Sequence, residues 1–569
     1  MSAAMTASVE PIPYRIRIGV TGHRSLHDSQ SIEALVKQLL CTQFKSLFPP
    51  DAQAQVERMK RAGTTPVLYR VLSSLAEGAD RVVARAVLSD PGARLEAVIP
   101  LAVEDYLATF ESDEARSEFH ALLAQSRKPV VMRARLLRDE RSDPAAQAEL
   151  RHQAYSRAGR FVVDHCDVLI AVWDGERARG VGGTAEIVQY ALKQRRPVFR
   201  IWHGSVHLIN AGNHLALDAG ALMAVDQFNR QPLAPGYLKS LNRNYFEAAR
   251  IARWIPESVR SMVNARLFPY YAKASDAAKV SQKRFYNAGK TIYALSAAAV
   301  GCAAVGVLFP VIAWLGFTAE LMLLGIILLT LWQAERRHSR EIWIENRFLA
   351  ERIRCGIFMA ICGVEPKPID VLPFMGYSQT ANDWTVRAFD EIWDRLPPLR
   401  GSVGQDWRQL RLYIRTVWIR EQIKFHQIKT VKEGRAARHL ALAGKIVLPT
   451  TLAAAALHLL LLAWQPAVAA AESVHLLHLG LHRGLAFVAL LFPAVAASLA
   501  GMEAHREHRR LEKRSANMCR QLDRIGWEMK LAADPERFEA LLQHLDEEVM
   551  LRETQDWLML MRYVEIKAG

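Results

Sequence analysis

The chain is 569 residues long, which argues against a single core and predicts three to four domains at roughly 150 residues each. Its net charge of +15 at pH 7 accompanies 51% apolar residues, and the basic residues flank long apolar runs. This pattern is typical of a membrane protein that follows the positive-inside rule, and lipid headgroups explain the charge without nucleic acid.

The six cysteines are scattered, with no CxxC pair and no His/Cys spacing typical of a metal site. They indicate a reducing compartment. Residues 1–13 lack the apolar segment of a signal peptide and are expected to be disordered. We therefore expect the first domain to stay in the cytosol.

Residues 14–205 alternate between strand-like and helix-like segments. The first strand is predicted at Tyr14–Gly22, and a helix over residues 28–48 follows until Pro49-Pro50 stops it. Further strands are predicted at residues 66–75, 95–100, 129–132, 166–173 and 197–202, with helices ending at Leu88 and covering residues 145–164 and 185–195. This alternation predicts βαβ units, and therefore an α/β, Rossmann-like fold with a parallel sheet.

One stretch, CDVLIAVWDGERARGVGGTAE from Cys166 to Glu186, combines a buried strand with a glycine-rich loop. Its glycines at 180, 182 and 183 would let backbone amides approach a ligand closely, and Thr184 would cap the following helix. In an open α/β sheet, such a helix start after a parallel strand is where phosphate binds. The alternative interpretation is an ordinary βα turn.

Three turns at the carboxyl ends of strands are expected to share one crevice. In this crevice, Arg24 would offer a bidentate contact to phosphate. The alternatives are that Arg24 and Asp80 face only water and that His23 merely caps its turn. The candidate ligand-binding residues are Gly22, His23, Arg24, Glu77, Gly78, Asp80, Gly180, Gly182, Gly183, Thr184 and Glu186.

The segments IGVTGHR, SLAEGAD and CDVLIAVWDGERARGVGGTAE together resemble the SLOG superfamily, over the first 205 residues. The resemblance implies a nucleotide or nucleotide derivative bound on a Rossmann-like sheet, with phosphate at the glycine-rich turn. Its LOG phosphoribohydrolases carry PGGxGTxxE, whose last Glu and an upstream Arg support N-glycosidic cleavage. Here the prolyl residue is absent and Ile187 stands at the acid position. An enzyme of this kind would therefore use Glu186, two residues after Thr184, with Arg160 or Arg157.

Residues 206–290 are expected to be a linker with cytosolic helices, and residues 291–333 a first transmembrane hairpin. Glu320 is the single charge from Thr291 to Trp332, so two spans fit, with the turn near Gly316–Glu320 or at Pro310.

A second transmembrane hairpin is predicted over residues 446–502, with residues 465–483 as an external loop. Cytosolic helices are expected at 334–445 and 503–569. Basic residues bracket both hairpins, which places their outer ends in the cytosol. The alternative, two buried hairpins in a soluble core, is disfavoured by the length of the uncharged runs.

This half resembles a tandem pair of SLATT domains, two-transmembrane effector modules that accompany SLOG sensors. The resemblance implies a multi-pass protein of the bacterial inner membrane with both termini in the cytoplasm. Such a protein would sense a nucleotide-derived ligand, permeabilise the membrane and act in defence against phage, and we expect it to form a homo-oligomer. The alternative function is a membrane-anchored nucleotide N-glycosidase.

Overall fold

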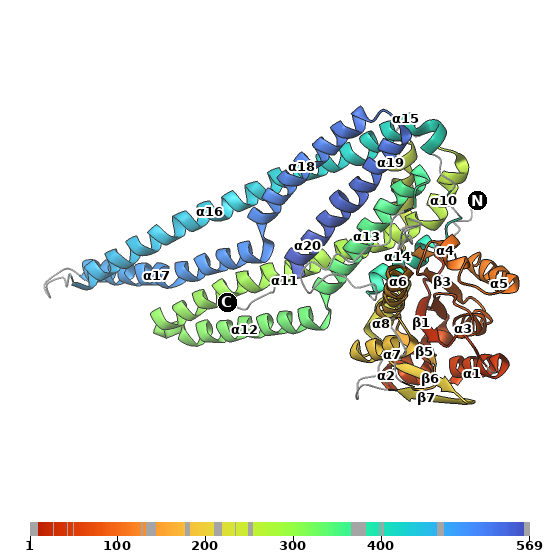
Figure 1. Cartoon of the computed structure of the whole chain (residues 1–569). Coiled ribbons are helices and arrows are strands. Elements are labelled where there is room, and N and C mark those ends of the chain that lie inside the picture. Colours follow the sequence, from red (N-terminus) through yellow and green to blue (C-terminus); the bar gives the residue numbers. More distant parts are fainter. Residues whose placement is uncertain are drawn as a thin grey trace, which may run out of the picture. The chain divides into compact units, whose positions relative to one another are not determined.

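The computed structural model describes residues 9–26, 28–42, 44–48, 50–126, 129–132, 144–176, 182–209, 219–233, 235–247, 254–365, 383–397, 399, 403–463 and 472–562. Most of the stretch predicted to be disordered, residues 1–8, therefore lies outside the described residues. The chain divides into two compact units (Figure 1). The first combines Met1–Pro232 with Pro368–Pro397, and the second combines Leu233–Lys367 with Pro398–Gly569.

The first unit is built on a sheet whose described strands run in the order β4-β3-β2-β1-β5-β6-β7. The strands are β1 (Tyr14–Gly22), β2 (Val67–Ser73), β3 (Arg94–Ile99), β4 (Val130–Val131), β5 (Val168–Val172), β6 (Val198–Trp202) and β7 (Ser205–Ile209). All neighbours pair in parallel except β6 and β7. The predicted Rossmann-like α/β fold is confirmed, while the antiparallel β7 falls in a stretch predicted as linker.

Helices of the first unit connect these strands or, in the case of the last two, follow the last strand in sequence. They are α1 (Ser29–Thr42), a 3-10 turn η1 (Phe44–Leu47), α2 (Pro50–Ala62), α3 (Ala79–Leu88), α4 (Val103–Leu107), α5 (Asp113–Leu123), α6 (Pro144–His165), α7 (Thr184–Lys193), α8 (Ala219–Arg230) and α14 (Trp384–Trp393). Side chains of α6 and α7 pack with β5 in one apolar core that includes Val162, Leu169 and Ile187. The single helix predicted over residues 28–48 is wrong after Thr42, where α1 ends and the separate turn η1 follows at Phe44–Leu47.

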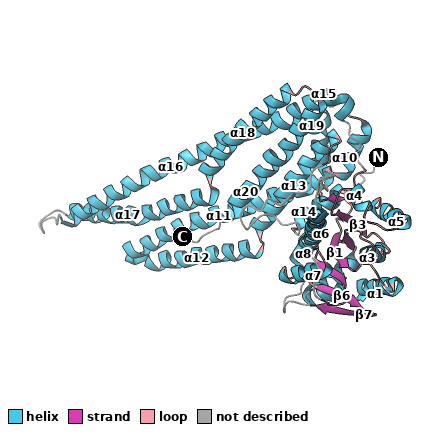
Figure 2. Cartoon of the chain, viewed as in Figure 1, coloured by secondary structure: helices cyan, strands magenta, loops and turns pink. Residues whose placement is uncertain are grey.

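The second unit consists of long helices packed as hairpins (Figure 2). Its elements are α9 (Pro235–Asn242), η2 (Arg243–Glu247), α10 (Glu257–Arg266), α11 (Phe268–Leu308), η4 (Pro310–Ile312), α12 (Ala313–Arg336), α13 (Ser339–Cys362), α15 (Val403–Tyr413), η5 (Ile414–Ile419), α16 (Arg420–Ala463), α17 (Glu472–Arg506), α18 (His508–Leu531), α19 (Pro535–His544), η6 (Leu545–Leu551) and α20 (Arg552–Arg562). α11 packs against α12 and α13, and α16 against α17 and α18.

Within the described residues, four helical stretches are long and apolar enough to cross a membrane: Phe268–Leu308, Pro310–Cys362, Trp407–Ala463 and Leu477–Leu531. Large apolar side chains on them are exposed, Leu321 and Leu459 among them. Exposed apolar surface on this scale is unfavourable in water and suits lipid. These stretches suggest a multi-pass membrane protein.

Two details of the predicted hairpins need correction. The first hairpin turns at Pro310, one of the two positions expected, so the placement of Glu320 at the turn is wrong and this residue lies inside α12. Gly316 permits close helix packing instead, because a Cβ there would lie 2.7 Å from the carbonyl oxygen of Cys302. In the second hairpin, the predicted loop at 465–483 is helical from Glu472 onward.

Candidate functional site

A two-lobed cleft opens at the carboxyl ends of β1 and β5. From β1 the sheet grows through β2, β3 and β4 on one side, and through β5, β6 and β7 on the other. The direction of the strand order therefore changes between β1 and β5. Ligands of open α/β sheets bind at this position. The two lobes, of about 620 Å³ and 450 Å³, share His23, Arg24 and Asp174.

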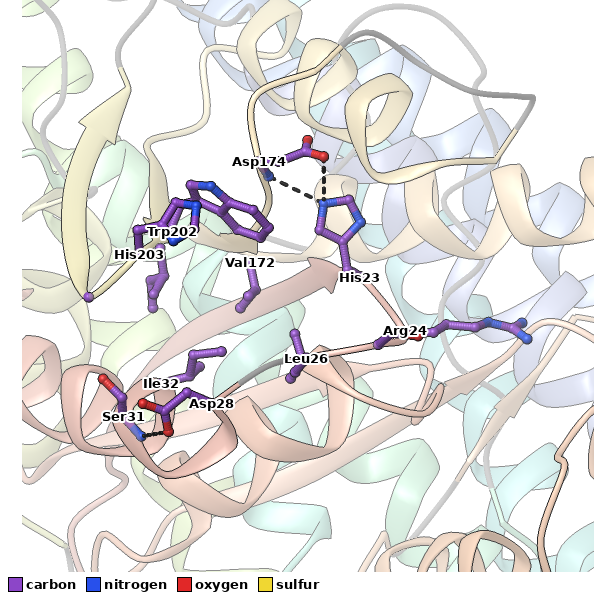
Figure 3. Close-up of a pocket in the computed structure, with 13 residues that line it drawn as sticks. His23, Arg24, Leu26, Asp28, Ser31, Ile32, Val172, Asp174, Trp202 and His203 are labelled. Atoms are coloured by element: carbon purple, nitrogen blue, oxygen red, sulfur yellow. Dashed lines mark hydrogen bonds and ion pairs between the residues drawn. The ribbon is translucent and has the colours of Figure 1, made fainter.

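The larger lobe, which we call the apolar lobe after one of its walls, has aromatic and aliphatic side chains on that wall and polar ones, such as Asp28 and Ser31, elsewhere (Figure 3). Its apolar lining residues are Leu26, Ile32, Val172, Ile201 and Trp202. The Trp202 ring meets His23 edge to face, with ring centroids 5.6 Å apart. Such walls suit a flat, apolar or aromatic group. Sequence reasoning did not single out Trp202, although it ends a predicted strand.

A contact between His23 and Asp174 separates the lobes (Figure 3). The backbone N–H of Asp174 donates to Nε2 of His23 over 3.2 Å, and the Asp174 carboxylate lies 3.5 Å from the same nitrogen. The backbone N–H of His23 donates to the carbonyl of Val172, which fixes the turn to β5. The predicted ligand residue His23 is thus placed at the centre of the cleft.

The turns after β1 and β2 are packed backbone to backbone. Gly78 has a φ of 82°, and a Cβ there would lie 2.0 Å from the carbonyl oxygen of Arg24. A Cβ on Gly22 would lie 2.4 Å from that of Ala79. Both glycines therefore permit the two turns to touch. Gly22 also lines the smaller lobe, whereas Gly78 and its neighbour Glu77 are not among the lining residues.

Asp80 contributes a buried carboxyl group to the smaller lobe, which we call the polar lobe after this residue and Arg24. The Ser73 hydroxyl donates to Oδ2 of Asp80 over 3.3 Å. Burial raises the pKa of Asp80 to about 6, although hydrogen bonds from Ala76, Ser73 and Ser74 favour its ionised form. This acid can therefore take up a proton near neutral pH.

Tyr106, on α4, is a lining residue of the same lobe. The side chain is fully buried, lines the lobe, and its hydroxyl has no hydrogen-bond partner among the described residues. Its ring packs against Phe110 and Phe119. An unpaired buried hydroxyl costs about 1 to 3 kcal/mol, so a bound ligand that pairs with it would recover this cost. Sequence reasoning missed Tyr106, which nothing local distinguishes from a core aromatic.

Arg24 lies on both lobes and extends away from the apolar one (Figure 3). Its guanidinium donates to the Tyr155 hydroxyl over a long 3.4 Å and lies 5.7 Å from the centre of the Tyr155 ring. Tyr155 comes from α6 and lines the polar lobe. The guanidinium therefore keeps donors for an anion, as its predicted role requires.

The start of α7 closes the polar lobe. Gly182, Gly183 and Thr184 line it, while Gly180 lies outside the described residues. The prediction of Thr184 as N-cap is wrong: Gly183 is the N-cap and Thr184 the first helical residue. The free N–H groups of this helix start still suit an anion.

Glu186 ties this turn to α6. Its Oε2 accepts from the backbone N–H of Gly182 over 2.7 Å, and its Oε1 accepts from the Ser156 hydroxyl and from Arg160 at 2.8 and 2.9 Å. Burial opposes ionisation of Glu186, but these hydrogen bonds outweigh it and lower its pKa. Glu186 and Arg160, two of the residues considered for catalysis, form an ion pair, while the alternative Arg157 is exposed. Glu186 is not among the residues that line either lobe.

Comparisons of the chain with protein-family models, curated proteins and solved structures found no match. The described residues form an α/β sheet domain followed by a long helical region with four long apolar stretches.

Proposed function

We propose that this protein is a ligand-gated membrane effector whose sheet domain senses a nucleotide-derived molecule. The observation that carries the proposal is the two-lobed cleft, in which Trp202 lines one lobe, the start of α7 and Tyr106 line the other, and Arg24 lines both. A nucleotide has a flat base at one end and phosphate at the other. The resemblance to SLOG sensors supports the same ligand class.

In the proposed complex, phosphate binds the backbone N–H groups of Gly183 and Thr184 together with the Arg24 guanidinium. The base lies against Trp202 in the apolar lobe. His23 and Asp174, between the lobes, face the sugar, which offers hydroxyl groups to both.

The helical hairpins would form the membrane part. Arg483 lies over the Phe309 ring at 5.6 Å, and Arg506 lies over the Tyr286 ring at 4.2 Å. On each of the two chain segments these levels are 23 residues apart, about 34 Å of helix, which is close to the roughly 30 Å of a bilayer core. Matching cation–aromatic levels on neighbouring helices support two membrane interfaces.

The proposed topology places both outer ends of each hairpin, and both termini, in the cytoplasm of a bacterial cell. Labelling of the exposed Cys41 tests it, because this residue belongs to the sheet domain. A membrane-impermeant maleimide should label the wild-type chain more than the Cys41→Ser variant in inside-out vesicles. A difference seen only in right-side-out cells would contradict the topology.

Ligand binding would shift the hairpins toward an arrangement that lets ions pass, within a homo-oligomer in the lipid bilayer, and so stop phage multiplication. This requires different affinities of the ligand for two arrangements, because equal affinity shifts no equilibrium.

The alternative, a nucleotide N-glycosidase acting through Glu186 and Arg160, has less support. Both oxygens of Glu186 already accept hydrogen bonds, and its lowered pKa makes it a poor proton donor.

The experiment that tests the function uses the full chain in liposomes loaded with a self-quenched dye. AMP, ATP and NAD serve as probes, together with small molecules that mass spectrometry finds co-purified with the protein. We expect at least one of these compounds to bind and release the dye without being consumed. Multiple-turnover release of free base, lost in Glu186→Gln, would instead favour the N-glycosidase.

A further inference from the structure

The short helix α14 completes the sheet domain, although it comes from the middle of the helical half of the chain. It follows α13 and precedes α15 in sequence, between the two apolar hairpins, yet belongs to the first unit. Its apolar face is buried, with Ile392 at 0% exposure. Trp384 packs against Phe228 of α8, with ring centroids 6.0 Å apart. Apolar packing therefore holds α14 on this domain, in addition to its charged contacts.

The charged contacts of α14 lie at the amino ends of the strands, opposite to the cleft. Arg15 of β1 donates to Oε2 of Glu391 over 2.8 Å, and Arg70 of β2 donates to Oε1 of the same residue over 2.6 Å. Arg70 and Arg94 both donate to Asp394, just after α14, at 2.7 and 3.0 Å.

A second pair joins α14 to β5. Arg387 donates to Asp167, the residue before β5, over 2.9 Å, and Asp167 also accepts the backbone N–H of Arg17 over 2.8 Å. The Arg17 side chain reaches Asp390 at 3.3 Å. α14 thus contacts the first residues of the two central strands, β1 and β5.

We call these charges the amino-end cluster. It comprises five arginines, Arg15, Arg17, Arg70, Arg94 and Arg387, and five carboxylates, Glu96, Asp167, Asp390, Glu391 and Asp394. Without α14 and Asp394, four arginines would face only Glu96 and Asp167. Because Arg15, Arg17 and Arg70 are less than 9% exposed, the sheet would then hold uncompensated buried cations. The buried arginines of the sheet are therefore compensated by the carboxylates of α14 and by Asp394.

We propose that α14 is the output element of the sensor, the contact through which the state of the cleft reaches the segment that joins the two hairpins. β1 carries Arg15 and Arg17 at one end and His23 and Arg24 at the other. β5 likewise runs between Asp167 and the cleft. A ligand that moves the carboxyl ends of these strands acts on α14 through the same two rigid elements. This inference rests on the proposed function for its direction of signalling.

The test compares Glu391→Gln with Glu33→Gln in the full chain. Glu391→Gln keeps the shape of the side chain and removes its charge, whereas Glu33 pairs with Lys37 on the surface of α1 and serves as the control. Asp394→Asn, at a partly exposed member of the cluster, is the milder second variant if Glu391→Gln fails to fold.

The first readout needs no ligand. In Glu391→Gln, backbone hydrogen exchange of α14 in the full chain should become about tenfold faster than in wild type. Exchange in the turns at residues 22–24 and 172–176 should also change, within the usual range of coupling between sites. Faster exchange in α14 with unchanged exchange in both turns would overturn the inference, whether or not nucleotides bind.

The second readout uses dye-loaded liposomes with AMP, ATP and NAD. We expect Glu391→Gln to bind the active probe within about twofold of wild type and to release dye at least about tenfold less, while Glu33→Gln behaves as wild type. Equal binding with equal release would overturn the coupling. If none of the probes binds the wild-type chain, the sensor proposal for these nucleotides fails, and the exchange readout alone decides the role of α14.

Discussion

The amino and carboxyl ends of the parallel sheet both carry arginines and carboxylates, but these groups are paired differently at the two ends. At the amino ends, each of the five arginines of the amino-end cluster hydrogen-bonds a carboxylate. At the carboxyl ends, Tyr106 has no partner among the described residues, Asp80 is buried with a raised pKa, and Arg24 has one long hydrogen bond. Burial also differs, because Arg24 is exposed whereas Arg15, Arg17 and Arg70 are buried.

This difference separates stability from binding. Charges at the amino ends stabilise one arrangement of α14 and the strands, because removal of any partner leaves another charge buried. Groups at the carboxyl ends are held in place at a cost that a ligand can recover. Substitutions at the two ends should therefore affect different measurements.

The largest effect is expected at the amino ends. Glu391→Ala leaves Arg15 and Arg70 without their shared partner, which should cost about 3 to 5 kcal/mol of folding free energy. Thermal unfolding of the sheet domain, followed by protease sensitivity of the full chain, measures this loss. Wild-type resistance in the variant would show that the amino-end cluster contributes no stability.

The second-largest effect is expected on ligand affinity and not on the stability of the fold. Arg24→Ala removes a charge-assisted contact of about 1.5 to 3 kcal/mol, so the affinity for the active nucleotide should fall roughly tenfold or more. Its unfolding midpoint should remain close to wild type, because the Arg24 side chain is exposed and, among the described residues, makes only the long hydrogen bond to Tyr155. Unchanged affinity would place the phosphate elsewhere.

Tyr106→Phe sharpens the comparison, because it should move the two measurements in opposite directions. Removal of the unpaired hydroxyl should stabilise the ligand-free chain by about 1 kcal/mol and weaken ligand binding about fivefold. Tyr69→Phe is the control: its hydroxyl donates to the carbonyl of Leu40, so its loss should only destabilise. Weaker stability in Tyr106→Phe would mean that the hydroxyl has an internal partner.

The sequence predicted what depends on local pattern. The run from Val168 to Val172 is apolar throughout because β5 is buried on both faces, and glycine at 182 and 183 marks a helix start. The order of strands and helices, and the two apolar hairpins, followed from the same kind of periodicity.

What the sequence could not reveal depends on partners far along the chain. Alternation of Arg15 and Arg17 with apolar residues is typical of a half-exposed strand, yet both are buried because α14 supplies carboxylates from more than 370 residues away. Tyr106 looks like any core aromatic until its neighbours are known. Glu186 was predicted as a ligand or catalytic group because of its position after the glycines, but its partners on α6 cannot be read from that position.

The smallest expected effect is a pH dependence of binding that only the carboxyl ends can produce. Burial raises the pKa of Asp80 from 3.8 to about 6, so its ionised form is disfavoured in the folded chain. This cost is fully present above pH 6 and falls as the pH drops toward 3.8. A nearby phosphate adds negative charge and should favour the protonated form further.

We therefore expect NAD, if it is bound, to bind a few-fold more tightly at pH 5.5 than at pH 7.5, within the roughly 1.4 kcal/mol that corresponds to one pKa unit. NAD is the suitable probe because its diphosphate bridge does not titrate in this range, unlike the phosphate monoester of AMP, whose second pKa is about 6. Asp80→Asn should bind equally at both pH values, since an amide has no proton to gain. An unchanged pH dependence in Asp80→Asn would assign the effect to another group of the cleft.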